Sequence, residues 1–462
     1  MRKLLLGVLL LLGVTGGVGC KKEKEAKKEH VITSEDYVWG NTTSKLQTPI
    51  LVTEKGHYYY SEQYGGWRYY DVETRQELYL CNKPECKHDG NEFCVATNGK
   101  YQYERFTMYN DMIYATAVEV TETQYLYKLI AIALDGSELT EVATYMTVER
   151  SGQIPDNNTM KTELCIHRNK ALIPMTAMGE DGLSESRLYG TALLDLDTKE
   201  VEYLDEEPLS KDNLTVKNIT GHGDYIYYCR REGKKNVLHR RHIKDNTDES
   251  YKLLVGFDGR YVVLDENTVV YLKLRYDAAS LCVHNHITGE NVERDPYIWR
   301  EIISTLPDGT TERHVTYYSI ADITTDGTYL YVEHVAIGCS KSAGEGEEYH
   351  TVKQWLQADV RVLDYDFNEL ALVNITDSKF PEGVPQMSWN DARYQSVQEN
   401  LHFLGEDIYV SLYENEPDYE YVSGSPVVEN GLYTFKFKRS DLLKNDVKME
   451  FVYKREVQEE KE

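Results

Sequence analysis

Short apolar runs recur along the chain, each preceded by a polar or glycine turn and most of them ending in tyrosine. The first run is Gly56-His57-Tyr58-Tyr59-Tyr60, and the runs end at Tyr60, Tyr114, Ile173, Tyr227, Tyr271, Tyr331 and Tyr409. Neighbouring runs are spaced by 44 residues (227 to 271) to 78 residues (331 to 409). Short apolar runs rich in tyrosine and β-branched residues, bounded by turn residues, predict strands rather than helices.

Each run belongs to a longer unit. A second apolar segment follows it and ends in an acidic or glycine turn, as in residues 126–136 and 188–197. Another segment precedes the run, such as Ser319–Thr324, and a fourth follows the turn, such as Leu370–Val373. Four short strands per unit, repeated about seven times with almost no helical periodicity, are typical of β-propeller blades.

We therefore expect an all-β protein in which residues 37–462 form one β-propeller, most simply of seven four-stranded blades. Six or eight blades also fit the spacing, and the alternative architectures are a set of β-sandwiches or an open solenoid. Closure into a ring leaves no long open strand edge, so a chain of this length can stay soluble.

The composition agrees with a folded β protein and narrows the partners. The chain has 38 Tyr against 9 Phe, and 77 acidic against 51 basic residues give a formal net charge of −26. Tyrosine favours pleated, half-buried strands. A chain this acidic is not attracted to nucleic acid or to an anionic membrane by its overall field.

The N-terminus has the features of an export signal. Met1-Arg2-Lys3 is basic, and Leu4–Val14 is an apolar run too short to span a bilayer. Gly17-Val18-Gly19-Cys20 then resembles the lipobox of bacterial lipoproteins, although Gly17 replaces the usual Leu. The resemblance implies that Cys20 is acylated and becomes the mature N-terminus. The alternative is an ordinary secretory signal with an incidental cysteine.

On this interpretation residues 1–19 are a lipoprotein signal peptide and residues 20–36 are a charged tether anchored by lipid. No later segment approaches the length of a membrane span. The expected location is the outer face of the cytoplasmic membrane, outside the cytoplasm, with contact to the membrane through the lipid alone.

Three cysteines and one histidine lie within 14 residues, at Cys81, Cys86, His88 and Cys94. This set could supply a tetrahedral Cys₃His shell for a structural zinc ion, although the spacing is not that of a standard zinc finger. Outside the cytoplasm, a disulfide between two of the cysteines is the main alternative, and free thiols are the third. A catalytic metal would need an open coordination position, which nothing in the motif marks.

Long connections at 294–316, 335–358, 375–398 and 413–430 are expected to open on one face of the propeller. They are acidic and carry aromatic candidates for ligand binding, namely Trp299, Trp355, Trp389, Tyr349, Tyr419 and Tyr421. Exposed aromatics among carboxylates suit stacking on sugar rings, or contact with a cationic protein. The alternative is that these aromatics fix the loops and bind nothing.

Two further clusters are weaker candidates. Cys282, His284 and His286 share one strand face by their spacing, which could hold a metal, but an ordinary strand is the simpler interpretation. Residues 230–244 form a basic hairpin that could bind an anionic partner, or could pair with neighbouring acidic blades. No hydrolase, zinc-protease, P-loop or dinucleotide motif is present, so no catalytic residue is assigned.

The tyrosine-marked repeat and the Cys81–Cys94 motif resemble the Tyr-rich β-propeller lipoproteins of Gram-positive gut bacteria, which are similar to TolB-like propellers. The resemblance implies the fold and says little about activity. The leading hypothesis is a non-enzymatic binding or scaffold protein for a carbohydrate polymer or an envelope protein. The others are a carbohydrate-active enzyme with an unidentified carboxylate pair, and a structural or sensor component of an envelope complex.

Overall fold

The computed structural model describes fourteen segments of the unit Thr33–Glu462. They are residues 50–61, 66–149, 161–162, 164–177, 187–204, 216–275, 278–295, 298–305, 311–341, 351–374, 379–384, 387–388, 401–414 and 432–455. The expected signal peptide, Cys20 and the charged tether lie outside these segments. None of the helices within them has the length and apolar character that crossing a bilayer requires.

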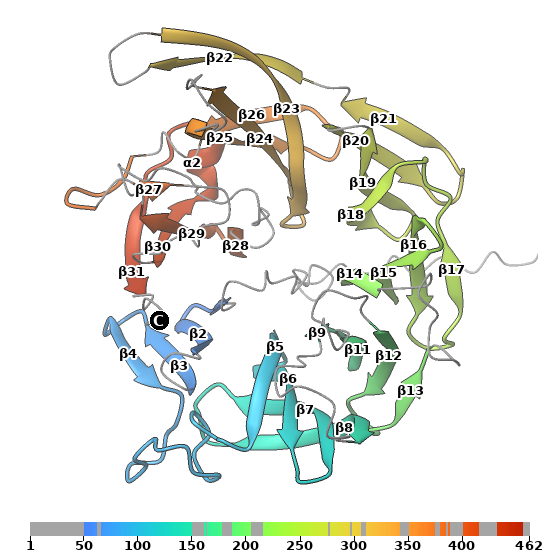
Figure 1. Cartoon of the computed structure of the whole chain (residues 1–462), viewed down its shortest axis with the longest axis vertical. Helices are drawn as coiled ribbons and strands as arrows, with labels where there is room; N and C mark the ends of the chain where they lie inside the picture. Colours follow the sequence, from blue (N-terminus) through green and yellow to red (C-terminus); the bar gives the residue numbers. More distant parts are fainter. Residues whose placement is uncertain are drawn as a thin grey trace, which may run out of the picture. The chain divides into compact units, whose positions relative to one another are not determined.

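The described strands form seven antiparallel sheets, each built from one continuous stretch of chain. The sheets follow one another around a ring, and helix is almost absent (Figure 1). The expectation of an all-β propeller with seven four-stranded blades is confirmed.

The first three blades contain the following strands. Blade one is β1 (Ile50–Val52), β2 (Gly56–Ser61), β3 (Gly66–Asp71) and β4 (Gln76–Tyr79). Blade two is β5 (Tyr101–Tyr109), β6 (Met112–Val120), β7 (Gln124–Ala133) and β8 (Leu139–Glu149). Blade three is β10 (Cys165–His167), β11 (Lys170–Ala177), β12 (Arg187–Asp195) and β13 (Val201–Tyr203), with β9 (Lys161–Thr162) beside β11.

The remaining blades repeat the plan. Blade four is β14 (Val216–His222), β15 (Tyr225–Glu232), β16 (Lys235–His242) and β17 (Asp248–Ser250). Blade five is β18 (Phe257–Asp265), β19 (Thr268–Arg275), β20 (Ala278–Asn285) and β21 (Asn291–Asp295). Blade six is β23 (Thr311–Thr325), β24 (Leu330–Lys341), β25 (Thr351–Leu363) and β26 (Glu369–Asn374), with β22 (Ile298–Thr305) beside the first half of β23. Blade seven is β28 (Leu401–Leu404), β29 (Asp407–Glu414), β30 (Leu432–Lys438) and β31 (Glu450–Arg455), with β27 (Met387–Ser388) beside β29 and the short α2 (Arg439–Leu443) after β30.

The seven runs identified in the sequence all lie on the second strand of a blade, from β2 to β29. Their tyrosines pack between blades, and Tyr227, Tyr271 and Tyr331 are fully buried. The Tyr271 hydroxyl donates to Asn291 Oδ1 at 3.0 Å, and the Tyr331 hydroxyl donates to Asp326 Oδ2 at 2.7 Å. A phenol supplies apolar area in the core and one hydrogen bond at its tip, which explains why tyrosine is used here rather than phenylalanine.

The acidic turns between third and fourth strands are held by side chain to backbone hydrogen bonds. Asp135 accepts from the Ser137 N–H at 2.9 Å, Asp195 from the Thr198 N–H at 2.9 Å, and Asp364 from the Asn368 N–H at 2.8 Å. Such bonds stabilise tight turns locally. A share of the acidic residues is therefore used for chain reversal rather than for ligand binding.

Two of the long connections expected from the sequence are largely strand. Residues 298–305 and 311–318 pair as a hairpin, and residues 335–341 pair with 351–358. The interpretation of these residues as loop is wrong. Backbone ladders extend these hairpins without the alternating apolar run that marks a half-buried strand, so the sequence pattern gave no sign of them.

Aromatic side chains of blades one and seven contact one another, and among the described residues these two blades share no strand. The Tyr70 hydroxyl donates to the Val452 carbonyl oxygen at 2.9 Å, and the Tyr70 and Tyr453 rings stack with centroids 4.5 Å apart. The His57 ring lies edge-on to Tyr409, with centroids 5.0 Å apart. These contacts join the first and last blades within the described residues.

Candidate metal centre and adjoining pocket

The loop between β4 and β5, residues 80–100, is here called the cysteine loop. It lies at the outer edge of the ring between blades one and two (Figure 1). Backbone bonds fix it on both sides: the Trp67 N–H donates to the Ala96 oxygen at 2.8 Å, and the Asn82 N–H donates to the Gly136 oxygen at 3.3 Å. Cys94, Val95 and Ala96 are buried, so the loop has its own apolar anchor without regular secondary structure.

The cysteine loop brings together the four residues expected from the sequence. The ligand atoms of Cys81, Cys86, His88 and Cys94 all lie within 4.8 Å of one another. His88 Nδ1 is 3.4 Å from Cys94 Sγ. In a tetrahedral zinc site, bond lengths of ~2.3 Å to sulfur and ~2.0 Å to nitrogen put such a pair ~3.6 Å apart. The cluster therefore could hold a metal such as zinc with little rearrangement.

The His88 ring is oriented by a stack of side chains. His88 adopts a left-handed backbone conformation with φ of 52°, which turns its side chain back toward the cysteines. Its ring stacks on Tyr79 with centroids 4.4 Å apart, and the Arg68 guanidinium lies 3.6 Å from the centroid of the Tyr79 ring. Groups that fix the orientation of a ligand histidine contribute to metal affinity.

The thiols differ in their readiness to ionise. Burial disfavours the Cys94 thiolate, but hydrogen bonds from Thr97 and His88 outweigh burial and lower the pKa of Cys94 to about 6. The Thr97 N–H donates to Cys94 Sγ at 3.3 Å. At Cys86 the backbone bond from His88 lowers the pKa, but burial and the neighbouring thiols raise it overall. Since the thiolate is the form that binds metal, Cys94 is prepared to act as a ligand near neutral pH.

The cysteines whose side chains are described are Cys81, Cys86, Cys94, Cys165, Cys229 and Cys282, and none of these is joined in a disulfide. Cys229 and Cys282 are fully buried, as expected for small core residues. A count of free thiols would distinguish a disulfide in the cysteine loop from a metal site, because a disulfide removes two thiols and a bound metal removes none.

A cavity of about 490 Å³ adjoins the cluster, and we call it the loop pocket. It lies between the cysteine loop and the turn that joins β7 to β8. Its lining residues are Lys83, Glu92, Phe93, Cys94, Val95, Asn98, Lys100, Tyr101, Ser137, Glu138, Leu139 and Glu141. Cys94 both belongs to the cluster and lines the loop pocket.

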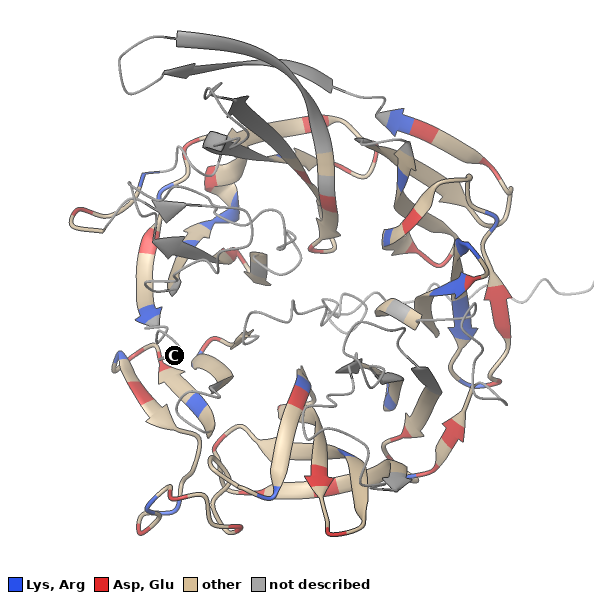
Figure 2. Cartoon of the chain, in the orientation of Figure 1, with Lys and Arg blue, Asp and Glu red and all other residues tan. Residues whose placement is uncertain are grey.

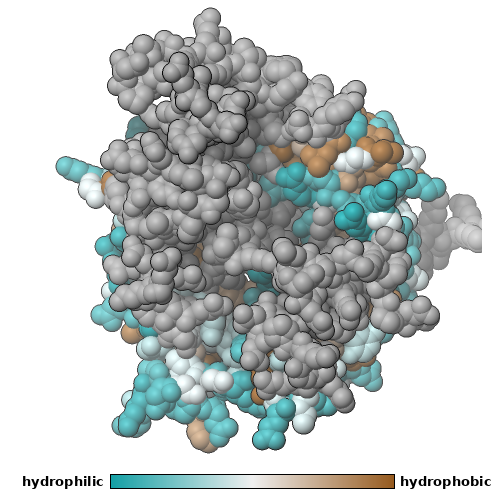
Figure 3. Space-filling model, in the orientation of Figure 1, coloured by the Kyte–Doolittle hydropathy of each residue, from teal (hydrophilic) through white to brown (hydrophobic). Residues whose placement is uncertain are grey.

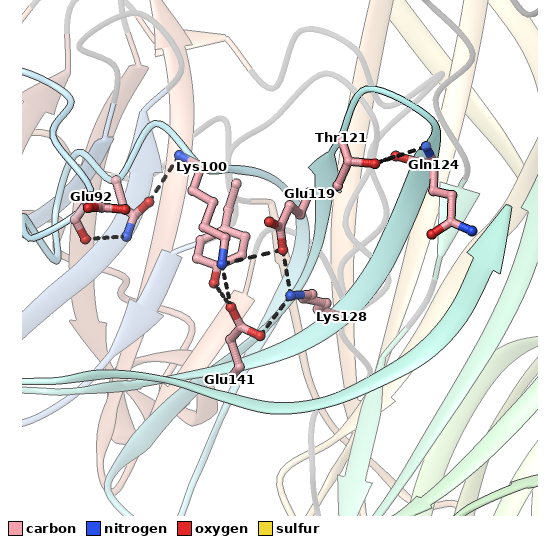
Figure 4. A network of polar contacts seen from close by, with 9 residues as sticks. Glu92, Lys100, Glu119, Thr121, Gln124, Lys128 and Glu141 are labelled. Carbon is pink, nitrogen blue, oxygen red and sulfur yellow. Dashed lines mark hydrogen bonds and ion pairs between the residues drawn. The ribbon is translucent and has the colours of Figure 1, made fainter. Parts of the chain in front are cut away.

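A network of ion pairs lies at the floor of the loop pocket, and two of its members, Lys100 and Glu141, line the cavity. Figure 4 shows Lys100, Glu119, Lys128 and Glu141 pointing toward one another. Lys128 Nζ lies 2.5 Å from Glu119 and 2.7 Å from Glu141, and Lys100 Nζ lies 2.7 Å from Glu141. Burial disfavours the Glu141 carboxylate, but bonds from Lys100, Lys128 and Tyr101 lower its pKa to about 2. The charges of the floor are therefore compensated internally.

The aromatic candidates of the long connections are not tested by the described side chains. The backbones of Trp299 and Trp355 lie in β22 and β25, opposite Tyr317 and Gly338, and nothing is described of the two tryptophan side chains. Trp389, Tyr349, Tyr419 and Tyr421 lie outside the described residues. Their common face stays a prediction.

The basic hairpin is partly neutralised by neighbouring strands. Arg240 bonds Glu249 at 2.9 and 2.8 Å, and Arg241 lies 3.1 Å from Glu202 on blade three. Figure 2 shows the basic β16 beside the acidic β17. The interpretation that this hairpin pairs with a neighbouring acidic blade is confirmed for Arg241, whereas Arg240 pairs within blade four.

The Cys282 strand face is an ordinary one. His284 Nδ1 lies 3.1 Å from Asn291 Oδ1, and His286 Nε2 lies 3.3 Å from Glu249, so the two rings serve different partners. In the described part of the chain, the Cys₃His cluster is the one group of three or more His, Cys, Asp or Glu side chains placed to hold a metal.

The loop pocket and Phe93 were not identified from the sequence. Phe93 is 72% exposed, whereas its neighbour Cys94 is fully buried. The face in Figure 3 shows both hydrophilic and hydrophobic described surface, and among the exposed large apolar side chains Phe93 is the more exposed of the two phenylalanines. The sequence does show a large apolar residue beside a cysteine in an otherwise polar loop, which marks Phe93. It does not reveal the pocket, because the turn that completes the pocket lies on another blade.

No protein-family model matches the chain, and no curated protein matches it. Among solved structures it is similar to an oligogalacturonate lyase in complex with manganese, at 10% identity and a TM-score of 0.41, covering 81% of this chain and 87% of that one. A puromycin-hydrolysing peptidase of Mycobacterium tuberculosis has 9% identity and a TM-score of 0.41, covering 91% and 55%. A putative TolB of Agrobacterium tumefaciens has 11% identity and a TM-score of 0.29, covering 66% and 87%. These likenesses concern the fold alone.

Proposed function

We propose that this chain is a lipid-anchored, extracytoplasmic β-propeller that acts as a non-enzymatic binding protein for a carbohydrate polymer or an envelope protein. In this proposal a structural zinc ion at Cys81, Cys86, His88 and Cys94 stiffens the cysteine loop. The partners are neither nucleic acid nor the membrane surface itself, since the net charge of −26 opposes both.

The observation that carries the proposal is the closed donor set beside a pocket. Four side chains converge within 4.8 Å, which fills a tetrahedral shell and leaves no position for a catalytic water. The same loop forms one wall of the 490 Å³ loop pocket. In this arrangement the metal would have a structural role, because it would fix one wall of a pocket in which a ligand binds.

Three carboxyl groups have pKa values that suit structural roles. At Asp195, a bond from Lys170 is the main cause that lowers the pKa to about 2, and at Asp245 bonds from Thr247 lower it to about 2. Glu141 in the loop pocket has a pKa of about 2 as well. A general acid of glycoside hydrolysis needs the opposite shift, so these carboxyl groups are suited to holding turns and lysines.

Metal analysis of the purified full chain tests the zinc proposal. We expect close to one zinc per chain, and a cobalt-substituted sample with the visible absorption of tetrahedral thiolate ligation. Cys86→Ser should lose the metal, whereas Cys229→Ser, at a buried cysteine of blade four, should keep it. A metal-free protein whose intact mass is two hydrogens lower, with two thiols missing on titration, would establish the disulfide instead.

The anchor is tested by fractionation. The full chain expressed in a bacterium that processes lipoproteins should partition with membranes and carry lipid on Cys20. The variant Cys20→Ser should be released in soluble form outside the cytoplasm. If both proteins are recovered equally in the soluble extracytoplasmic fraction, the signal is an ordinary secretory one.

One observation favours the enzyme as a second candidate. Asp322 on β23 and Glu333 on β24 are direct cross-strand partners, and both are buried, with 1% and 0% exposure. Cross-strand neighbours have Cβ atoms ~5 Å apart, which is near the carboxyl separation of retaining glycosidases. Their burial weighs against access by a substrate. Release of reducing sugar that disappears in both Asp322→Asn and Glu333→Gln would replace the binding proposal with this one.

A further inference from the structure

The cysteine loop presents Phe93 on a rigid base. The Phe93 N–H donates to Asn91 Oδ1 at 3.0 Å, and its carbonyl oxygen accepts from Lys83 Nζ. The next residues, Cys94 and Val95, are 0% and 3% exposed. The backbone of Phe93 is therefore fixed on both sides while its ring stays 72% exposed at the loop pocket. A ligand that covers this ring gains the free energy of burying apolar surface, and it does not have to order the backbone of Phe93 first.

The polar lining opposite Phe93 is rich in both donors and acceptors but carries little unpaired charge. Lys100 and Glu141 are bonded to each other at 2.7 Å, and Tyr101 donates to Glu141. Asn98 is 92% buried and is held by two bonds, from its Nδ2 to the Glu92 carbonyl oxygen and from the Lys100 N–H to its Oδ1, both 3.0 Å.

These features discriminate between classes of ligand. An anion entering the loop pocket meets Glu92, Glu138 and Glu141, and a cation meets Lys83 and Lys100. A neutral ligand with many hydroxyl groups can instead bond to ammonium and carboxylate groups alike. A pyranose ring also has an apolar C–H face that packs on an aromatic ring. The cavity of about 490 Å³ lies within the ~300–1,000 Å³ typical of small-molecule sites.

We propose that the loop pocket is a binding site for a neutral saccharide, with Phe93 as the stacking platform and the Lys100–Glu141 pair and Ser137 as hydrogen-bonding groups. This inference rests on the proposed function as a binding protein and names the site and the class of its ligand. It places recognition at the outer edge between blades one and two, away from the long hairpins of blade six.

The test is calorimetric titration of the full chain with cellohexaose, mannohexaose, xylohexaose and galactohexaose, and with hexagalacturonate as an anionic probe. We expect one or more neutral hexaoses to bind and hexagalacturonate to bind at least tenfold more weakly. Phe93→Ala should weaken the neutral binding at least tenfold, and Phe93→Tyr should restore most of it. Phe451→Ala is the matched control, because Phe451 is also an exposed phenylalanine, at 43%, but lies on blade seven.

The outcomes separate the two proposals. If a neutral hexaose binds the wild type and Phe93→Ala alike, the loop pocket is not the site, while the binding function stands. If hexagalacturonate alone binds, the neutral class is wrong. If no probe binds, the saccharide inference is overturned, and a pull-down of an envelope protein by the same preparation would still support the binding function. Cleavage of a hexaose during the titration would overturn both.

Discussion

Replacing Tyr453 by alanine tests how the propeller closes. The Tyr453 ring is 6% exposed and lies 4.5 Å from the Tyr70 ring, 5.4 Å from His57 and 6.5 Å from Tyr59, all on blade one. Removing a buried aromatic side chain costs ~3–5 kcal/mol. With an entropy of unfolding of about 2.1 cal/mol/K per residue over roughly 400 residues, 4 kcal/mol lowers Tm by about 5 °C.

Calorimetry measures the change in Tm, and hydrogen exchange shows which strands lose protection. Exchange should accelerate most in β1, β2 and β31, because the loss occurs where the first and last blades meet. Phe451→Ala, on the same strand but 43% exposed, should cost about 1 kcal/mol, and Tyr70→Phe should cost about 1 kcal/mol by removing the bond to the Val452 oxygen. If Tyr453→Ala lowers Tm no more than Phe451→Ala, or if exchange rises equally in all blades, aromatic closure is refuted.

The remaining predictions concern the junction of blades one and two. Gly136 has φ of +68°, and an added Cβ would lie 2.6 Å from backbone atoms of Leu80 and Cys81. Gly136→Ala should therefore lower Tm by several degrees and release metal from the cluster. As the control, Gly289→Ala has a similar φ of +72° but open space around the added Cβ, so it should cost only about 1 kcal/mol of stability and keep the metal. Lys128→Met leaves Glu119 and Glu141 facing each other and should lower the free energy of unfolding, measured with denaturant, by about 2–3 kcal/mol. Lys100→Met removes a side chain that is 37% exposed and should lower it by under about 1 kcal/mol. Equal losses of stability in the two variants would contradict the assigned burial of Lys128. The pKa of Glu141 is about 2 in the folded chain against 4.5 ordinarily, so its contribution is complete above pH 4.5 and is lost as the pH falls toward 2. Since the side chain is 40% exposed, solvent screening limits that contribution to about 1 kcal/mol, and Glu141→Gln should flatten this part of the stability–pH curve.

The blade plan could be predicted because it is repeated and local. A tyrosine on most second strands and acidic residues at the outer turns satisfy requirements that recur from blade to blade, as at Tyr271 and Asp195. The Cys₃His cluster could be predicted for the same reason, since its four members lie within one loop. The extended hairpins of blade six could not, because no alternation of apolar and polar residues marks their paired strands.

The loop pocket lay beyond sequence reasoning because its walls come from two blades. The Asn82 N–H to Gly136 oxygen bond fixes the distance between them, and the Lys128 network fixes the floor. Both constraints are polar, and they add to the apolar contacts of Leu80, Val95 and Ala96 with the core between blades one and two. Polar bonds and apolar packing together therefore hold the two walls of the loop pocket beside the metal cluster, with the Phe93 ring exposed at its margin.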